Sequence, residues 1–204
     1  MNYIMLNDRK IDLTDEQVKE IKKSFDLGKV KLSEIKVGET FKVEDHEFIV
    51  LEQSGDTTAV ILKDLLYVGK EFGKNNNYDG SNVDKLCNDF AAKISKIIGK
   101  KNLIEHTVDL TSDDGLKDYG KIKRSASLLT CELYRKFVYI LDKYKIDKWW
   151  WLATPFSTPT HEDSSWIKCV SPIGYLYYSY YYGGIIGVRP FCIFSSSISV
   201  SYKD

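Results

Sequence analysis

The chain has 204 residues, of which 43% are hydrophobic and 28% charged, so it can bury one sizeable core without disulfide staples. Its 29 basic and 29 acidic residues balance, which argues against a nucleic-acid-binding protein because that class needs a basic excess. No apolar run reaches the ~18–20 residues of a membrane span. The first residues lack the basic and apolar segments of a secretory signal, which predicts synthesis in the cytoplasm without fixing the final compartment.

The N-terminal half reads as a helix followed by strands. Thr14 and Gln17 have the spacing of a capping box, and Gly28 ends the helical pattern that follows them. Residues before Ile11 form either a short strand or a tail. A hairpin is expected next, because two β-rich runs bracket a polar turn. The expected strands are 41–43, 47–51 and 57–62, and a long loop follows at 69–82.

The second half begins with a helix and ends in strands and loops. Ser81 and Asp84 open a helix as a capping box, and Gly99 is its expected end. Residues 100–126 are highly charged and are expected to be irregular, and a third helix is expected to begin near Thr130. The bulky run Trp149–Leu152 is expected to be extended and buried. Together these elements predict one α+β domain, with early helices, an antiparallel strand core and a long irregular C-terminal part.

The last quarter of the chain has a different composition from the rest. Six of the 14 tyrosines lie between Tyr175 and Tyr182. The 33 residues from Cys169 to Ser201 contain no Lys, Glu, Gln, Met or Trp, and Arg189 is their one charged residue. An arginine alone in so apolar a stretch is expected to be bonded within the fold, in a structural role.

Two interpretations of the tyrosine run stay open. Tyrosine offers a large, rigid, amphipathic contact surface, and serine and glycine beside it add adaptable hydrogen bonding, as in antibody binding sites. The alternative is a tyrosine-lined pair of strands half inside the core. Neighbours on a strand face opposite ways, which would place Tyr178, Tyr180 and Tyr182 on one face and Tyr175, Tyr177 and Tyr181 on the other. About half of the tyrosines would then stay exposed in either case. We therefore expect at least three exposed rings in one patch, joined by residues from Ser157 to Trp166, and favour a binding surface.

Catalytic and metal-binding patterns are weak. The chain has no nucleotide-binding glycine loop and no nucleophile elbow, so no catalytic residue is predicted. One histidine beside two carboxylates, His161–Asp163, is a poor metal pattern, and a solvated loop that touches a partner is favoured. Asp109, Asp113 and Asp114 lack the spacing of a calcium loop, which favours a solvated turn. Neither a metal nor a cofactor is predicted.

The four cysteines are expected to be free, buried thiols. They lie far apart and form no paired spacing, so neither a zinc site nor a redox pair nor a disulfide is indicated. They are Cys87, Cys131, Cys169 and Cys192.

Two segments carry a family resemblance. Trp150–Pro155 reads WWLATP and Gly187–Pro190 reads GVRP, with a Ser/Tyr/Gly-rich stretch between them. The pair resembles the WWLRSP…GVRP signature of a domain common in Firmicutes and their phages, with Ala153 in place of arginine. Residues 37–51, 78–90 and 128–130 resemble its opening hairpin, a helix and the step before the next helix. This resemblance implies a C-type-lectin-like fold, in the branch of the formylglycine-generating enzymes.

The same fold is used by the variable proteins of diversity-generating retroelements, and the stretch from Tyr175 to Ile186 resembles their variable patch. The resemblance implies a non-enzymatic protein that binds a protein or a cell-surface glycan, with the tryptophan run and Gly187–Pro190 as scaffold. Alternatives are a formylglycine-generating-type oxidase and a structural phage-particle subunit. The expected ligand contacts are Tyr175, Tyr177, Tyr178, Ser179, Tyr180, Tyr181, Tyr182, His161, Asp163, Ser164 and Trp166.

The resemblance also divides the chain. Residues 1–31 are expected to form an N-terminal helical extension, and residues 32–204 the C-type-lectin-like domain. Expected partners are the ligand and either a second copy of the chain or a phage-particle neighbour, with no nucleic acid and no membrane span. Two locations of the protein therefore stay open, the cytoplasm and a phage virion.

Overall fold

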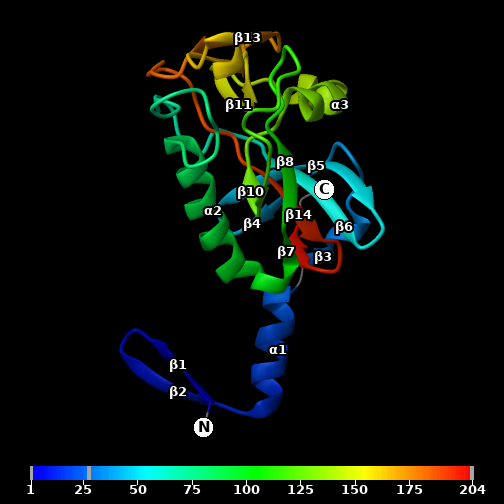
Figure 1. The fold of residues 1–204 in the computed structure, drawn as a ribbon. Helices are drawn as coiled ribbons and strands as arrows, with labels where there is room; N and C mark the ends of the chain where they lie inside the picture. The colour runs from blue at the N-terminus through cyan, green and yellow to red at the C-terminus, as the bar shows by residue number, and fades with distance from the viewer. Residues whose placement is uncertain (1, 27–28, 203–204) are drawn as a thin grey trace.

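The computed structural model describes residues 2–26 and 29–202, which form a mixed α+β protein (Figure 1). None of the helices in these two ranges has the length and apolar character that crossing a bilayer requires. The helices are α1 (Asp15–Asp26), α2 (Asn82–Ile98) and α3 (Cys131–Leu141), with short 3-10 segments at Leu32–Glu34, Lys100–Asn102, Asp142–Tyr144 and Pro159–His161.

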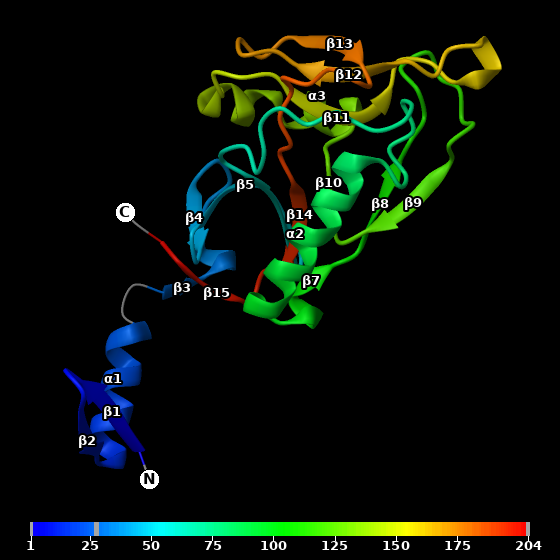
Figure 2. The ribbon, with the colours of Figure 1, turned by 90° about the vertical axis from the view of Figure 1, so that its left-hand side faces the viewer.

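The N-terminal segment is a hairpin followed by α1. The strands β1 (Asn2–Leu6) and β2 (Arg9–Leu13) pair antiparallel, so the segment holds a hairpin as well as the expected helix. The predicted capping box is confirmed, because Thr14 N donates to Gln17 Oε1 and Gln17 N donates to Thr14 Oγ1. Figures 1 and 2 show the hairpin and α1 projecting from the rest of the chain.

The largest sheet has eight strands and holds the expected meander. Its order is β10-β14-β6-β5-β4-β15-β3, and β7 also pairs with β14. Phe41 lies opposite Phe48, and Ile49 opposite Ile61, so apolar residues line the sheet's interior. The strands are β3 (Lys29–Lys31), β4 (Thr40–Val43), β5 (His46–Ser54), β6 (Thr57–Leu62), β7 (Leu103–Ile104), β10 (Ala126–Ser127), β14 (Phe191–Ser195) and β15 (Ser199–Ser201).

The expectation that residues 100–126 are irregular is wrong. Besides β7 and β10, they form the antiparallel pair β8 (His106–Asp109) and β9 (Lys121–Arg124). Val108 is buried opposite the half-buried Ile122, while the lysines on either side of Ile122 are exposed. This is a half-buried hairpin whose alternation is hidden by its many charges. His106, expected in a loop, is a buried strand residue with Nε2 2.9 Å from Ser127 Oγ.

A smaller sheet carries the tyrosine-rich region. It has the strand order β11 (Trp150–Pro155), β12 (Trp166–Val170) and β13 (Leu176–Tyr180). Its first strand is buried along its whole length, and α3 packs nearby, with the Tyr134 ring 5.7 Å from the ring of Trp150. Figure 2 shows this sheet and α3 together at one end of the molecule, with β13 on the outside.

The two signature segments meet in the fold. Trp151 N donates to Gly187 O, and Gly187 N donates to Trp149 O. Trp150 and Phe191 belong to one buried cluster, although their strands lie in different sheets. The two segments, expected to be neighbouring buried strands in one core, are thus in contact and largely buried, but their strands β11 and β14 belong to different sheets and do not pair with each other.

Arg189 has the structural role expected of it. It is 1% exposed, and its guanidinium donates to the carbonyls of Leu62 and Lys63 at 2.8 Å each. The same group lies over the ring of Trp150 at 5.2 Å. Burial lowers the pKa of Arg189 to about 10. The side chain thus ties the end of β6 to the second signature segment.

Candidate functional site

Strand β13 forms the outer side of the small sheet and holds most of the tyrosine run. It follows a tight turn, in which Gly174, at φ +88°, donates its N–H to Ser171 O. Beyond the strand, Gly183 N donates to Tyr180 O and the chain turns away. Tyr180 lies opposite Trp166 on β12, and Tyr178 lies opposite Lys168. The register therefore places these two tyrosines and Trp166 on one face of the sheet.

The rings of this region form a continuous series of contacts. The centroid of the Tyr180 ring lies 3.5 Å from that of Trp166 and 5.0 Å from that of Tyr182. The Tyr178 ring is 5.2 Å from Trp166 and 5.0 Å from Phe156. Tyr178, Tyr180 and Tyr182 thus gather together, as strand alternation predicted. Aromatic pairs at these separations stabilise each other by roughly 0.5–1.5 kcal/mol.

A second group of rings continues the surface around the strand. Tyr177 pairs across the sheet with Cys169, so it starts from the opposite face, yet its ring stacks on Tyr178 at 5.3 Å. It also meets Trp149 at 5.6 Å. Tyr181 is half-buried and meets Tyr182 edge-on at 5.1 Å. Both faces of β13 therefore contribute rings to one surface.

We call the five exposed side chains of this region the tyrosine surface. Ser179, which lies between two of them, is half-buried, as is Tyr181. With five exposed tyrosines, the expectation of at least three exposed rings is met. Their exposed fractions are Tyr175 68%, Tyr177 54%, Tyr178 41%, Tyr180 39% and Tyr182 53%.

A buried lysine lies beside the tyrosine surface. Lys168 is 8% exposed, and its Nζ lies 3.0 Å from Asp113 Oδ2. The same ammonium lies 5.7 Å from the Phe156 ring and 6.0 Å from the Tyr178 ring. Cations near ring faces are attracted by the ring quadrupole. Sequence reasoning missed both Lys168 and Phe156, although Phe156 is an apolar residue directly after the first signature segment.

Three other expected contacts lie in the neighbouring loop and bond elsewhere. His161 Nδ1 is 3.0 Å from Asp114 Oδ2, and that carboxylate also accepts from the hydroxyls of Ser112 and Ser157. Desolvation alone would raise the pKa of Asp114, but these hydrogen bonds hold it well below its usual value.

The remaining two loop residues bond to the backbone. Asp163 Oδ1 accepts from Ser165 N, and Ser164 O accepts from Asn76 N. Of the expected loop contacts, Trp166 is the one that packs against the rings of the tyrosine surface. The structure therefore brings together β13 and Trp166, and it places His161, Asp163 and Ser164 in a separate polar network.

Asn76 holds this loop in place, and sequence reasoning did not identify it. Its side chain is fully buried, and its amide donates to the carbonyls of Ser157 and Trp166 at 2.9 and 3.1 Å. The hydroxyl of Tyr119 donates to its Oδ1 at 2.7 Å. Asn76 thus fixes the start of β12, on which Trp166 and the tyrosine stack depend. Three consecutive asparagines gave a loop signal but no indication of which one is buried.

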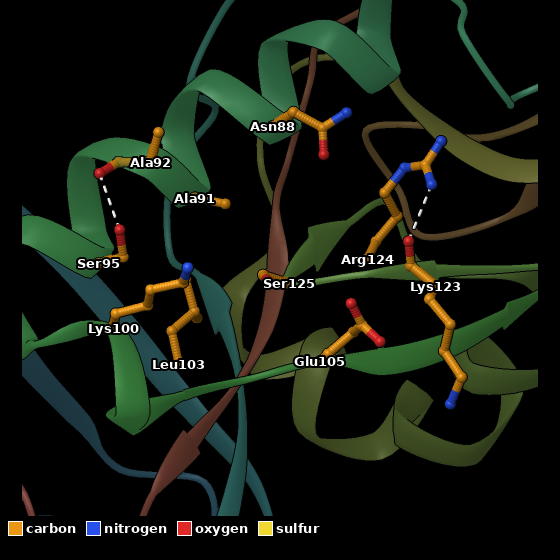
Figure 3. Close-up of a pocket in the computed structure, with 10 residues that line it drawn as sticks. All are labelled: Asn88, Ala91, Ala92, Ser95, Lys100, Leu103, Glu105, Lys123, Arg124 and Ser125. Atoms are coloured by element: carbon orange, nitrogen blue, oxygen red, sulfur yellow. Dashed lines mark hydrogen bonds between the residues drawn. The ribbon is translucent and has the colours of Figure 1, made fainter.

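A polar cleft of about 510 Å³ lies on another side of the molecule, between α2 and the segment from Glu105 to Ser125. Figure 3 shows Arg124 at its rim, opposite Asn88. The Arg124 guanidinium is already paired, with Nε 2.8 Å from Asp84 Oδ1 and Nη2 2.7 Å from Asp84 Oδ2. This pairing raises the pKa of Arg124. The cleft therefore offers no free arginine to an anion.

The cysteines are free and buried, as predicted. Burial raises the pKa of Cys87 and of Cys169 to about 12 each, and it raises the pKa values of Cys131 and Cys192 as well. A reactive cysteine needs a thiolate and access to solvent. These thiols have neither property. Over residues 2–26 and 29–202, no cluster of three His, Cys, Asp or Glu side chains is arranged to hold a metal ion.

The arrangement presents exposed rings and hydroxyl groups on and beside one strand. Comparisons with family models, with curated proteins and with solved structures found no match to this chain. The tyrosine surface therefore has to be interpreted from its own geometry.

Proposed function

We propose that this chain is a non-enzymatic binding protein that recognises another protein through its tyrosine surface, on a C-type-lectin-like scaffold. The observation that carries the proposal is the gathering of five exposed tyrosines on and beside one outer strand. Exposed aromatic patches of this kind usually mark interaction surfaces. Tyrosine loses little conformational entropy on binding, so such a surface gains affinity at low cost.

A protein ligand is favoured over a glycan by the way the rings pack. Sugars stack on open ring faces, but here ring faces are partly occupied by neighbouring rings, since Tyr180 contacts Trp166 and Tyr182. Tyr177 and Tyr178 stack on each other with an interplanar angle of 9°. Ring edges and hydroxyls are therefore a large part of what these residues offer to a ligand, and they suit the mixed polar and apolar surface of a protein.

Retroelement diversification of this surface is part of the proposal and has its own test. The adjoining DNA is expected to contain a reverse transcriptase and a near-copy of the segment encoding Tyr175 to Ile186, differing at adenines. If the neighbouring DNA holds neither, the surface is not diversified in this way. The oxidase alternative gains no support from the four buried thiols.

The binding test compares two sets of exposed tyrosines. Beads carrying the wild-type chain, the variant Tyr175→Ser/Tyr177→Ser/Tyr182→Ser and the control Tyr139→Ser are exposed to extract of host-cell surface proteins. Tyr139 is 88% exposed on α3 and does not belong to the tyrosine surface as defined above. Each of these tyrosines keeps roughly 60–95 Å² of its side chain buried, so each substitution is expected to cost about 1.5–2.5 kcal/mol of stability.

We expect the wild type and the Tyr139→Ser control to retain the same protein, and the triple variant to lose it while keeping a cooperative thermal transition. If the triple variant captures the same protein as the wild type and the control do, the proposal is contradicted. A retained species that glycosidase treatment releases would point to a glycan ligand instead.

A further inference from the structure

The outer side of β13 exposes backbone hydrogen-bonding groups as well as rings. Ser171 N donates to Tyr175 O, and Tyr181 N donates to Ser165 O, so odd-numbered residues of this segment bond to β12. Residues on a strand direct their backbone groups alternately to the two sides. Leu176, Tyr178 and Tyr180 therefore direct their N–H and C=O groups away from the sheet.

Within the described ranges, β13 pairs with β12 alone, and one of these outward groups is bonded: Tyr180 O accepts from Gly183 N. The outward N–H groups of Leu176, Tyr178 and Tyr180 and the outward carbonyls of Leu176 and Tyr178 make no other hydrogen bond there. Such a row of donors and acceptors is a template for another extended strand.

Other exposed strands of the protein carry charges that discourage such pairing, and β13 does not. The strand β9 carries Lys121, Lys123 and Arg124, and the edge strand β3 carries Lys29 and Lys31. Natural proteins use lysines in this way to keep sheet edges apart. The sequence of β13, Leu-Tyr-Tyr-Ser-Tyr, has no charge and no proline.

We propose that β13 pairs antiparallel with β13 of a second copy of this chain, about a two-fold axis at Tyr178. In this register each Tyr178 N–H donates to the Tyr178 carbonyl of the other copy. Each Tyr180 N–H donates to the Leu176 carbonyl of the other copy, which is free to accept. An edge that matches itself in this way forms a closed, isologous dimer, and the two small sheets become one continuous sheet.

The area available sets the strength of this dimer. Taking ~200 Å² for a whole tyrosine side chain, the tyrosine surface exposes about 500 Å² per copy. Two copies can therefore bury about 1,000 Å² of tyrosine, which is near the lower limit for a specific interface. We expect a reversible dimer with a dissociation constant on the order of tens of micromolar.

The test is sedimentation equilibrium at about 5 and about 500 µM protein, which bracket the expected constant. The wild type is expected to change from monomer to dimer. In Tyr178→Pro the outward N–H is lost, and an edge strand tolerates proline where its N–H faces solvent. In Tyr178→Lys two like charges meet at the two-fold axis. Both variants are expected to stay monomeric at the higher concentration.

A matched control places proline on a different edge. In β9, Lys123 lies between positions that bond to β8, so its N–H also faces away from its partner strand. Lys123→Pro is expected to dimerise like the wild type. If Tyr178→Pro does not fold, Tyr178→Lys gives the answer alone.

A wild type that stays monomeric at the higher concentration overturns the proposal, as does a dimer that persists in Tyr178→Lys. The result is separate from the proposed function, because the dimer is measured on the purified chain without a ligand. A wild type that captures a protein but stays monomeric would overturn the dimer alone, and a wild type that dimerises but captures no protein would overturn the proposed function alone.

Discussion

The buried imidazole of His106 makes the stability of the protein depend on mildly acidic pH. The side chain is 8% exposed, and its ring meets the ring of Phe191 edge-on at 5.1 Å. Its Nε2 is bonded to Ser127, while Nδ1 has no hydrogen-bond partner within the described ranges. Burial lowers the pKa of His106 from 6.5 to about 4, with the charge of Lys123 acting in the same direction.

The sign and size of the effect follow from linkage. The folded protein holds His106 neutral, whereas the unfolded chain protonates it near pH 6.5, so the unfolded state binds more protons between about pH 6.5 and 4. Stability is therefore lost as the pH falls through that window. A difference of one pKa unit corresponds to about 1.4 kcal/mol, so the loss from this residue at about pH 4.5 is roughly 2–3 kcal/mol.

The assay is urea unfolding of the wild type and of His106→Gln at about pH 7.5, 6 and 4.5. Glutamine does not titrate, and its amide can still reach the Ser127 hydroxyl. All other titrating groups, including His46, are present in both proteins and cancel in the comparison. Between about pH 7.5 and about pH 4.5, we expect the free energy of unfolding of His106→Gln to rise by roughly 2–3 kcal/mol relative to that of the wild type. If the free energies of unfolding of the two proteins change with pH by the same amount, the reasoning is refuted.

Two further predictions concern the scaffold of the site, each measured as a free energy of unfolding. A Cβ at Gly187 would lie 2.4 Å from Leu65 Cδ1 and 2.9 Å from Tyr67 O, so Gly187→Ala is expected to cost about 1–3 kcal/mol. Gly184→Ala, where a Cβ meets nothing within 4 Å, is the matched control, and an equal loss in both would contradict the packing argument. Asn76→Ala leaves the carbonyl of Ser157 without its donor and the hydroxyl of Tyr119 without its acceptor, while Trp166 O keeps its bond from Phe156 N, and it is expected to cost about 2–4 kcal/mol; a loss below about 1 kcal/mol would show that water replaces the amide.

Local signals in the sequence predicted the elements whose ends are set by neighbouring residues. The capping box at Thr14 is formed, and Ser81 caps its helix as expected, since Asp84 N donates to Ser81 Oγ; the carboxylate of Asp84 accepts from Gly80 N instead of Ser81 N. The hairpin around residues 44–45 and the third strand follow from turn residues and β-rich runs. These features depend on contacts within a few residues, which a single sequence displays.

What the sequence could not reveal depends on contacts between distant residues. The bonds from Asn76 cross 81 and 90 positions to the carbonyls of Ser157 and Trp166. Lys168 is buried because Asp113, 55 positions away, pairs with it. In β9 the lysines dominate the local composition, so the half-buried alternation was not visible until Val108 was seen opposite Ile122. Each of these partners is fixed by tertiary packing, which composition does not encode.

The same principle separates the tyrosines by role. Alternation along a strand predicted which rings would gather, but not that Tyr177 would stack on Tyr178 from the opposite face, because that contact depends on β13 having no further strand beside it. A strand with a neighbour on each side would have kept its two faces apart. The open edge therefore both joins the rings into one surface and leaves the Tyr178 backbone unpaired. A second copy at that edge would cover the tyrosine surface, so dimerisation and ligand binding are expected to compete there.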